Sequence, residues 1–269
     1  MKRTTLGKVP LERAFSKLGI ASRTQSRAWI AEGRVSVNGA VIKDPLFPVT
    51  PETAKIALDR KPIRAVSWRT VMLYKPKGVV TTRSDEKGRP TVFSLLDKKD
   101  AYLHPVGRLD MATTGLLLLT NDTRLSSWLT DPNNQIIRTY LVTVEGLVEP
   151  SDLKILEEGI RDQGEILKAE RVVLRKGSGK ESHLTVELTE GKNREIRRMF
   201  EAVGHEVTSL KRVAFGSLQL GKLEPGCYRD VTSKELVSAF GAIPINPDFA
   251  VQNPPRPLGL GRPIQSRRD

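Results

Sequence analysis

The stretch HPVGRLDMATTGLLLLTND, residues 104–122, decides the fold of this chain. A short polar loop that ends in Asp110 comes directly before the aliphatic run at 116–119, which predicts a buried strand. The strand anchors the loop, so its polar side chains are exposed but held in place. Residue type alone assigns Asp110 to a turn in which its carboxylate accepts hydrogen bonds from nearby backbone, and the Thr-Thr-Gly that follows agrees.

The pattern of strands and helices around this stretch predicts an α+β domain with a mainly antiparallel mixed sheet, because long strands follow one another without regular crossover helices. Asp122 is placed to cap a helix that runs through residue 129, and Thr232 with Glu235 forms a capping box for a helix at 234–240. Strands are expected at 71–74, 79–82, 116–120, 136–145, 166–174, 182–188 and 209–215, and further helices at 91–96, 151–158 and 194–203.

The first 66 residues are predicted to form a separate small α/β unit. Helical spacing covers 11–18, and Ser22 is a good N-cap for a second helix that Gly33 ends. Asn38-Gly39 between alternating valines predicts a type I′ hairpin. Residues 60–70 lack periodicity and are interpreted as a linker.

Charge is unevenly distributed along the chain of 269 residues, which has a formal net charge of +13. Residues 1–66 carry a surplus of eight positive charges, residues 67–246 a surplus of three and residues 247–269 a surplus of two. We therefore expect a dedicated polyanion-binding module at 1–66, a catalytic or scaffold unit at 67–246 and a flexible basic tail at 247–269. The partner predicted for the basic unit is a polyanion.

Several classes of protein are excluded by composition. One cysteine and three histidines cannot build a zinc finger or a disulfide framework. The aliphatic run at 116–119 is far shorter than the roughly 18 apolar residues of a membrane helix, so we expect a cytoplasmic protein with no membrane partner. GSGK at 177–180 lacks the earlier glycine of a phosphate loop, and no dinucleotide-type turn is present, so no metal, cofactor or small-molecule cofactor site is predicted.

A second informative stretch is EGKNREIRRMF, residues 190–200. It places four cations near the start of a helix, where the macrodipole disfavours positive charge. Such a placement predicts an anion nearby, either a carboxylate or an RNA phosphate. The four cations are Lys192, Arg194, Arg197 and Arg198.

Together these motifs resemble those of one enzyme family. KPKG at 75–78, GRLD at 107–110, RTY at 138–140 and NREIRRMF at 193–200 are similar, in order, to the motifs of ribosomal RNA pseudouridine synthases of the RsuA and RluB type. RVSVNG at 34–39 behind two short basic helices resembles the S4-type RNA-binding module that this type carries at its N-terminus. The similarity spans roughly residues 9–240.

The resemblance implies a role for each matched position. Asp110 would be the essential carboxylate, Tyr140 the aromatic that stacks on the target base, and Arg197 the ion-pair partner of Asp110. Arg108 would hold the displaced nucleotide. The remaining RNA contacts are expected from basic side chains of the two basic segments, namely Arg23, Arg27, Arg34, Lys192, Arg194 and Arg198.

The implied reaction is the isomerisation of a uridine to pseudouridine in ribosomal RNA or a ribosome assembly intermediate, by a protein expected to be a monomer. Nucleophilic attack by Asp110, charge stabilisation and proton abstraction from the sugar all remain possible routes. SDEKGRPTVFSLL at 84–96 resembles the large-subunit branch, which favours 23S over 16S ribosomal RNA. The alternative class is a non-catalytic RNA-binding factor associated with the ribosome.

Overall fold

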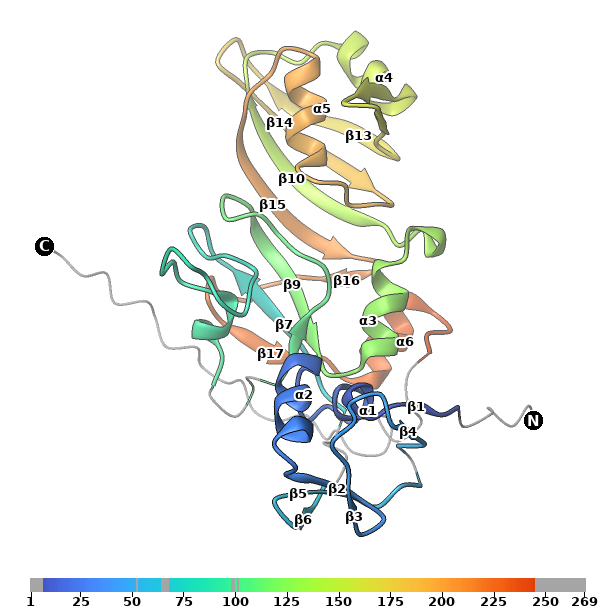
Figure 1. Ribbon diagram of the computed structural model, residues 1–269. Helices are drawn as coiled ribbons and strands as arrows, with labels where there is room; N and C mark the ends of the chain where they lie inside the picture. Colours follow the sequence, from blue (N-terminus) through green and yellow to red (C-terminus); the bar gives the residue numbers. More distant parts are fainter. Residues whose placement is uncertain (1–6, 52, 64–67, 98–99, 101, 245–269) are drawn as a thin grey trace, which may run out of the picture.

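The computed structural model describes residues 7–51, 53–63, 68–97, 100 and 102–244. A small unit built from the N-terminal residues lies at one end of the molecule, and a large curved sheet forms the rest (Figure 1). The predicted tail at 247–269 and part of the predicted linker, residues 64–67, fall outside the described residues. Within the described part, no helix is long and apolar enough to cross a membrane.

The small unit packs two helices on short strands. Its helices are α1 (Leu11–Lys17) and α2 (Arg23–Ala31). Its four-stranded sheet has the order β3 (Ala40–Val41), β2 (Val35–Val37), β5 (Ile56–Leu58) and β6 (Lys61–Pro62), and β1 (Val9–Pro10) pairs with β4 (Pro48–Val49). Leu11, Phe15, Ile30 and Val35 form its fully buried centre.

Local signals account for this unit. The Ser22 hydroxyl accepts the Gln25 N–H at 3.2 Å and so caps α2. Asn38 and Gly39 have φ of 52° and 91°, the positive values that a type I′ turn requires. Strands β5 and β6 were not expected, because three and two residues of extended chain carry no periodicity of their own; β5 forms by pairing with β2, and β6 by pairing with β5.

The large sheet has nine strands and mostly antiparallel neighbours, which confirms the predicted α+β class. Seven strands follow the order β13-β14-β10-β15-β9-β7-β17, while β16 pairs with β15 and β8 with β9. Their bounds are β7 Thr70–Lys75, β8 His104–Pro105, β9 Thr114–Thr120, β10 Arg138–Glu145, β13 Arg171–Gly177, β14 Glu181–Leu188, β15 Val207–Phe215, β16 Leu218–Gln219 and β17 Tyr228–Asp230.

A short parallel contact between β15 and β9 joins the two halves of this sheet. It consists of the pairs Lys211–Thr114 and Arg212–Gly115. Gly115 has a φ of +105°, and a Cβ atom at this position would lie 2.1 Å from the Arg212 carbonyl oxygen. Only glycine allows the two backbones to approach so closely.

In the part of the domain that the structure describes, four helices and two 3₁₀ turns accompany the sheet. They are α3 (Thr123–Thr130), α4 (Pro150–Glu158), α5 (Glu195–Ala202) and α6 (Ser233–Phe240), with 3₁₀ turns at Val92–Leu95 and Pro132–Asn134. Helix α5 covers the upper half of the sheet in Figure 1, whereas α3 and α6 lie beside the lower half. The predicted caps are present: Asp122 accepts backbone N–H groups of α3, and Thr232 and Glu235 form the capping box of α6.

Three predicted elements are wrong in detail. Residues 79–82 contain only an isolated bridge from Val80 to Thr91, not a strand. The expected strand at 166–174 is divided: β12 (Glu165–Leu167) pairs with β11 (Ile160–Asp162) in a separate hairpin, and β13 joins the main sheet. The chain bends between them because Ala169 is buried and bonds to α4 through its backbone N–H. The expected helix at 91–96 is a single 3₁₀ turn.

Candidate active site

Asp110 lies on the loop between β8 and β9, and this loop is fastened on both sides of it. The hydroxyl of Thr81 accepts the backbone N–H of Leu109 at 3.3 Å and donates to the Leu109 carbonyl at 2.8 Å. One residue after Asp110, the Met111 carbonyl accepts the Gly78 N–H at 2.9 Å. The half-buried carboxylate is therefore held on a backbone with little freedom to move.

Lys75, at the end of β7, binds the same loop through its ammonium group. Its side chain is fully buried at the end of β7, and Nζ donates to the carbonyl oxygens of Thr113 at 2.7 Å and Pro76 at 3.0 Å. Burial lowers the pKa of Lys75 to about 8, while the charge of Asp110 acts in the opposite direction. No role was predicted for Lys75 from the sequence. A lysine at the end of an apolar strand nevertheless indicates a buried charge.

Tyr140 faces the same space from the neighbouring half of the sheet. It lies on β10, opposite Val186 of β14 and Arg212 of β15, and only 7% of it is exposed. Asp110 and Tyr140 both line one cavity of about 300 Å³. The other lining residues are Gly107, Arg108, Leu109, Thr113, Leu188, Gly191, Lys192, Asn193, Arg194, Glu195, Ile196 and Leu210.

The predicted ion pair between Asp110 and Arg197 is not formed. No ion pair within 4.0 Å links the two among the described residues; instead, Nη1 of Arg197 donates to the Val207 carbonyl at 2.7 Å, and this bond holds the guanidinium toward β15. Arg197 lines an adjoining hollow of about 430 Å³ together with Arg194. Burial and the charge of Arg194 lower the pKa of Arg197, and the charge of Asp110 raises it.

Two buried arginines near Tyr140, on β10 and β15, are bound mainly by backbone carbonyls and do not line the cavity. Arg138 donates to the Leu129 carbonyl at 3.1 Å, and Arg212 donates to the Leu116 carbonyl at 2.7 Å. Burial lowers the pKa of Arg138, and the charge of Arg212 acts in the same direction, while the charges of Tyr140, Glu195 and Glu190 oppose it. The positive charge of these groups favours an anionic ligand nearby.

The loop before α5 forms one wall of the cavity and is itself internally bonded. The backbone N–H of Lys192 donates to Oε2 of Glu195 at 3.0 Å, and its ammonium group bonds to Glu190 and to the Ile166 carbonyl. Glu195 is buried, and burial together with the charge of Glu190 raises its pKa to about 7. Lys192 thus lines the cavity with its charge already partnered.

The predicted RNA contact by Arg198 stays a prediction, and its guanidinium already has internal partners. Its guanidinium bonds to Asp162 at 2.5 Å and to Glu165 at 2.7 Å, and only 12% of its side chain is exposed. Arg198 therefore ties α5 to the β11–β12 hairpin. Arg194 differs, because it is exposed, adopts a left-handed φ of 49° at the N-cap of α5, and lines the cavity.

The basic side chains of the small unit lie in three different settings. Arg23 is exposed at the start of α2. Arg27 bonds to Glu12 but keeps 61% of its side chain exposed. Arg34 is held by Asp59 and Glu32. Arg23 and Arg27 therefore remain accessible to a polyanion, whereas both sides of the Arg34 guanidinium are occupied by carboxylates.

Comparison with known proteins places the two units in known families. A family model described as RNA pseudouridylate synthase matches residues 69–202, and an S4 domain model matches residues 11–54. An uncharacterised RNA pseudouridine synthase of Aquifex aeolicus is 36% identical over 237 residues, covering 87% of this chain and 95% of that protein.

A further relative and a solved structure are also pseudouridine synthases. The ribosomal large subunit pseudouridine synthase B of Bacillus subtilis is 37% identical over 229 residues, covering 84% of this chain and 93% of that protein. A crystal structure of a pseudouridylate synthase superposes with a TM-score of 0.60 at 31% identity, covering 86% of this chain and 99% of the other. From its motifs, its cavity and these relatives, the chain belongs to the RNA pseudouridine synthase family.

Proposed function

We propose that this protein converts a uridine of 23S ribosomal RNA to pseudouridine, with Asp110 as the essential carboxylate. The observation that carries this proposal is the cavity of about 300 Å³, which Asp110 and Tyr140 line from the two halves of the sheet. The choice of 23S ribosomal RNA is supported by the relative from Bacillus subtilis, named for the large ribosomal subunit, and by the resemblance of residues 84–96.

The reaction breaks the bond between C1′ of ribose and N1 of uracil, turns the base, and joins C1′ to C5. It needs no redox partner and no added atom. A carboxylate beside the sugar attacks C1′, stabilises the positive charge that develops there, or removes a proton from C2′, and each route requires Asp110 to be ionised.

A uridine stacked in folded RNA must leave the stack to reach Asp110. Extrusion costs a few kcal/mol, and stacking on an aromatic face returns about 1–3 kcal/mol. Tyr140 provides that face within the cavity. Arg108, which lines the same cavity and has no internal partner among the described residues, is assigned to the RNA strand around the extruded nucleotide.

The two units of the chain have separate roles, and Arg197 has an indirect one. Residues 1–66 bind RNA through exposed cations such as Arg23 and Arg27, and residues 67–246 carry the catalytic site. Arg197 acts on Asp110 through its charge from the adjoining hollow, not by direct contact. The protein acts as a monomer in the cytoplasm, where ribosomal RNA is assembled into subunits.

The test uses the full chain with ribosomal RNA labelled with tritium at C5 of uridine. The wild-type protein is expected to release tritium from 23S RNA, and Asp110→Asn is expected to release none while still binding RNA. Glu224→Gln, which changes an exposed carboxylate that lines none of the cavities described, is the matched control and should behave as wild type.

Mapping pseudouridines in RNA from cells with and without the gene then identifies the substrate. Loss of a single pseudouridine from 23S RNA supports the proposal, whereas its loss from 16S RNA overturns the choice of subunit. If the wild-type protein binds RNA and releases tritium from neither, the chain is an RNA-binding factor and the catalytic proposal is wrong.

A further inference from the structure

A second cavity lies on the other side of Asp110. Its volume is about 450 Å³, and the segment at 80–89 forms its outer wall. It shares Arg108, Leu109, Asp110 and Asn193 with the cavity that contains Tyr140. The two cavities therefore meet at the carboxylate, and a ligand that fills the first reaches the entrance of the second.

The wall of this second cavity is preformed. Asp85 accepts the backbone N–H of Arg89 at 2.8 Å and a guanidinium N–H of the same residue at 2.6 Å, which closes the segment into a tight turn. The Thr81–Leu109 hydrogen bonds fasten the other end to the Asp110 loop. A ligand would bind here with little ordering of the chain, which lowers the entropic cost of binding.

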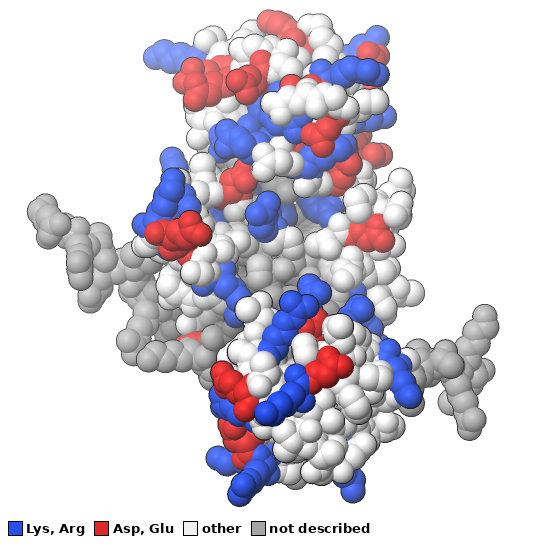
Figure 2. All heavy atoms as spheres, viewed as in Figure 1, with Lys and Arg blue, Asp and Glu red and all other residues white. Residues whose placement is uncertain are grey.

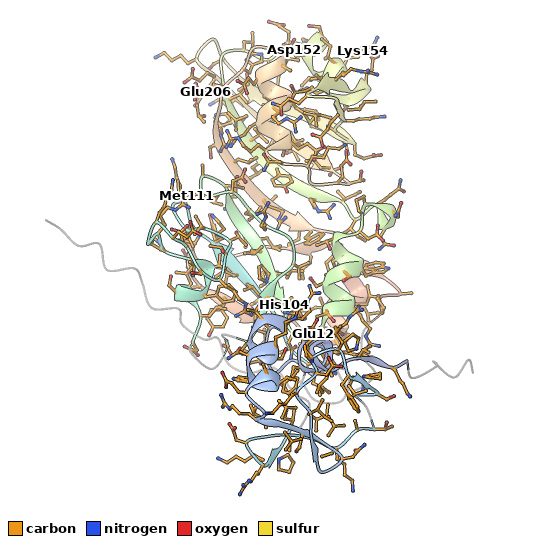
Figure 3. The ribbon with its side chains drawn as sticks, in the orientation of Figure 1. Glu12, His104, Met111, Asp152, Lys154 and Glu206 are labelled. Atoms are coloured by element: carbon orange, nitrogen blue, oxygen red, sulfur yellow. The ribbon has the colours of Figure 1, made fainter. Side chains whose placement is uncertain are left out.

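The exposed groups around the second cavity include one apolar side chain and two cations without an ion pair; the exposed carboxylate of Glu86 and the polar side chains of Ser84 and Asn193 also line it. Met111 is an apolar side chain that is 44% exposed, directly after Asp110. Lys87 and Arg108 are cations that make no ion pair with any described residue, whereas the charge of Arg89 is bound by Asp85. In Figure 3, Met111 lies on the left of the view, below Glu206 and above His104.

An apolar surface beside two unpaired cations matches the chemistry of a nucleotide. Nucleic-acid bases have apolar faces that stack or pack on side chains, and phosphates bind lysine and arginine. Lysine and arginine side chains also surround the hollow middle of the face shown in Figure 2. A nucleotide in the second cavity would be one residue along the RNA chain from a nucleotide in the first, because the two cavities share a wall.

We propose that the second cavity is a subsite for the nucleotide next to the target uridine, with its base on Met111 and its phosphate near Lys87 and Arg108. This inference rests on the proposed function, because it takes the first cavity as the place of the target uridine. It adds a requirement to the substrate: the enzyme recognises an extruded dinucleotide step and not a single uridine.

The experiment couples a change in the RNA to a change in the protein. Synthetic 23S fragments carry the mapped uridine with an abasic residue placed immediately before it, immediately after it, or four nucleotides away. The value of kcat/KM for pseudouridine formation is measured for wild type, Met111→Ala and Lys87→Ala. Lys222→Ala, an exposed lysine that lines neither cavity, is the matched control.

For the wild type, an abasic residue at one of the two adjacent positions is expected to lower kcat/KM about tenfold, as expected for the loss of one base contact. With Met111→Ala the unmodified RNA is itself slower by a similar factor, and the abasic residue causes little further loss. Lys87→Ala weakens binding of all the RNAs equally, and Lys222→Ala changes nothing.

Equal abasic penalties in wild type and Met111→Ala at both adjacent positions would overturn the subsite. Met111→Leu keeps an apolar surface and should retain the wild-type pattern, which separates loss of the contact from loss of folding. Failure of the proposed function has a different signature, because the wild-type protein would then form no pseudouridine in the unmodified RNA.

Discussion

The ammonium group of Lys75 donates a 2.7 Å hydrogen bond to the carbonyl of Thr113, three residues after the proposed catalytic Asp110. This bond connects the end of β7 to the loop that presents the carboxylate. Lys75→Met is expected to leave buried carbonyls unpaired, and the loss of one such partner costs about 1–3 kcal/mol of unfolding free energy. The loop would lose its support, so pseudouridine formation should fall as well.

Urea denaturation and tritium release at saturating RNA measure the two effects of Lys75→Met. Lys77→Met is the control, because Lys77 belongs to the same KPKG motif but is exposed. A Lys75→Met protein with the stability and turnover of the wild type would show that the buried ammonium group does not hold the loop.

Tyr140 is expected to separate stacking from the chemistry of its hydroxyl. Tyr140→Phe keeps the ring and should bind RNA as wild type, so any fall in turnover reports a role of the hydroxyl in proton transfer. Tyr140→Ala removes a ring that is nine-tenths buried and should cost about 3–5 kcal/mol of stability together with most of the activity. Thermal unfolding and single-turnover kinetics with the same RNA distinguish the two changes.

The salt dependence of RNA binding is expected to distinguish accessible from internally paired arginines. Arg23→Ala should reduce the slope of log K against log salt concentration by about one, as for one lost phosphate contact. Arg198→Ala should leave the slope unchanged and lower the unfolding temperature, because Arg198 bonds to Asp162 and Glu165. A reduced slope for Arg198→Ala would place its guanidinium on RNA.

Glu195 predicts a specific pH dependence of stability. Its pKa is raised to about 7 in the folded protein, mainly by burial and then by the charge of Glu190. Between the usual carboxyl pKa and about 7, the folded state binds more protons than the unfolded state, so this group lowers the unfolding free energy as pH rises through that range. Glu195→Gln should remove this loss, and denaturation at pH 5 and pH 8 compares the two proteins.

Gly115 is expected to tolerate no side chain. A Cβ atom there would lie 2.1 Å from the Arg212 carbonyl oxygen, at a φ that disfavours L-residues, so Gly115→Ala should separate β9 from β15 and unfold or inactivate the protein. Gly179→Ala is the control, because a Cβ at Gly179 meets nothing within 4 Å. Circular dichroism and thermal melting check both variants.

Features that depend on neighbouring residues were predictable from sequence. The Asn38-Gly39 turn, the Asp122 cap and the Thr232–Glu235 capping box are all present, since each is set by a few adjacent side chains. The division of 166–174 was not predictable, because both pieces are strands and only the burial of Ala169 against α4 shows where the chain bends.

The candidate site was also only partly predictable from sequence. The resemblance predicted that Asp110 and Tyr140 belong to one site, and both line one cavity. It did not show which arginines have partners inside the protein. Arg197 bonds to the Val207 carbonyl and Arg198 to carboxylates of a distant hairpin, partners that are 10 to 36 residues away in sequence. Their availability depends on tertiary contacts, which a motif of consecutive letters does not contain.

The order β10-β15-β9 gives the parallel contact at Gly115 a mechanical consequence. Tyr140 is on β10, and Asp110 precedes β9. Because β15 alone lies between these strands, two strand spacings, about 10 Å in all, separate the strand that carries Tyr140 from the strand that follows Asp110. β15 pairs with β9 at two residues, and two side-chain hydrogen bonds, from Thr114 to the Leu210 carbonyl and from Arg212 to the Leu116 carbonyl, also cross this junction. The position of one half of the sheet relative to the other, and with it the opening between Tyr140 and Asp110, therefore depends on this short contact.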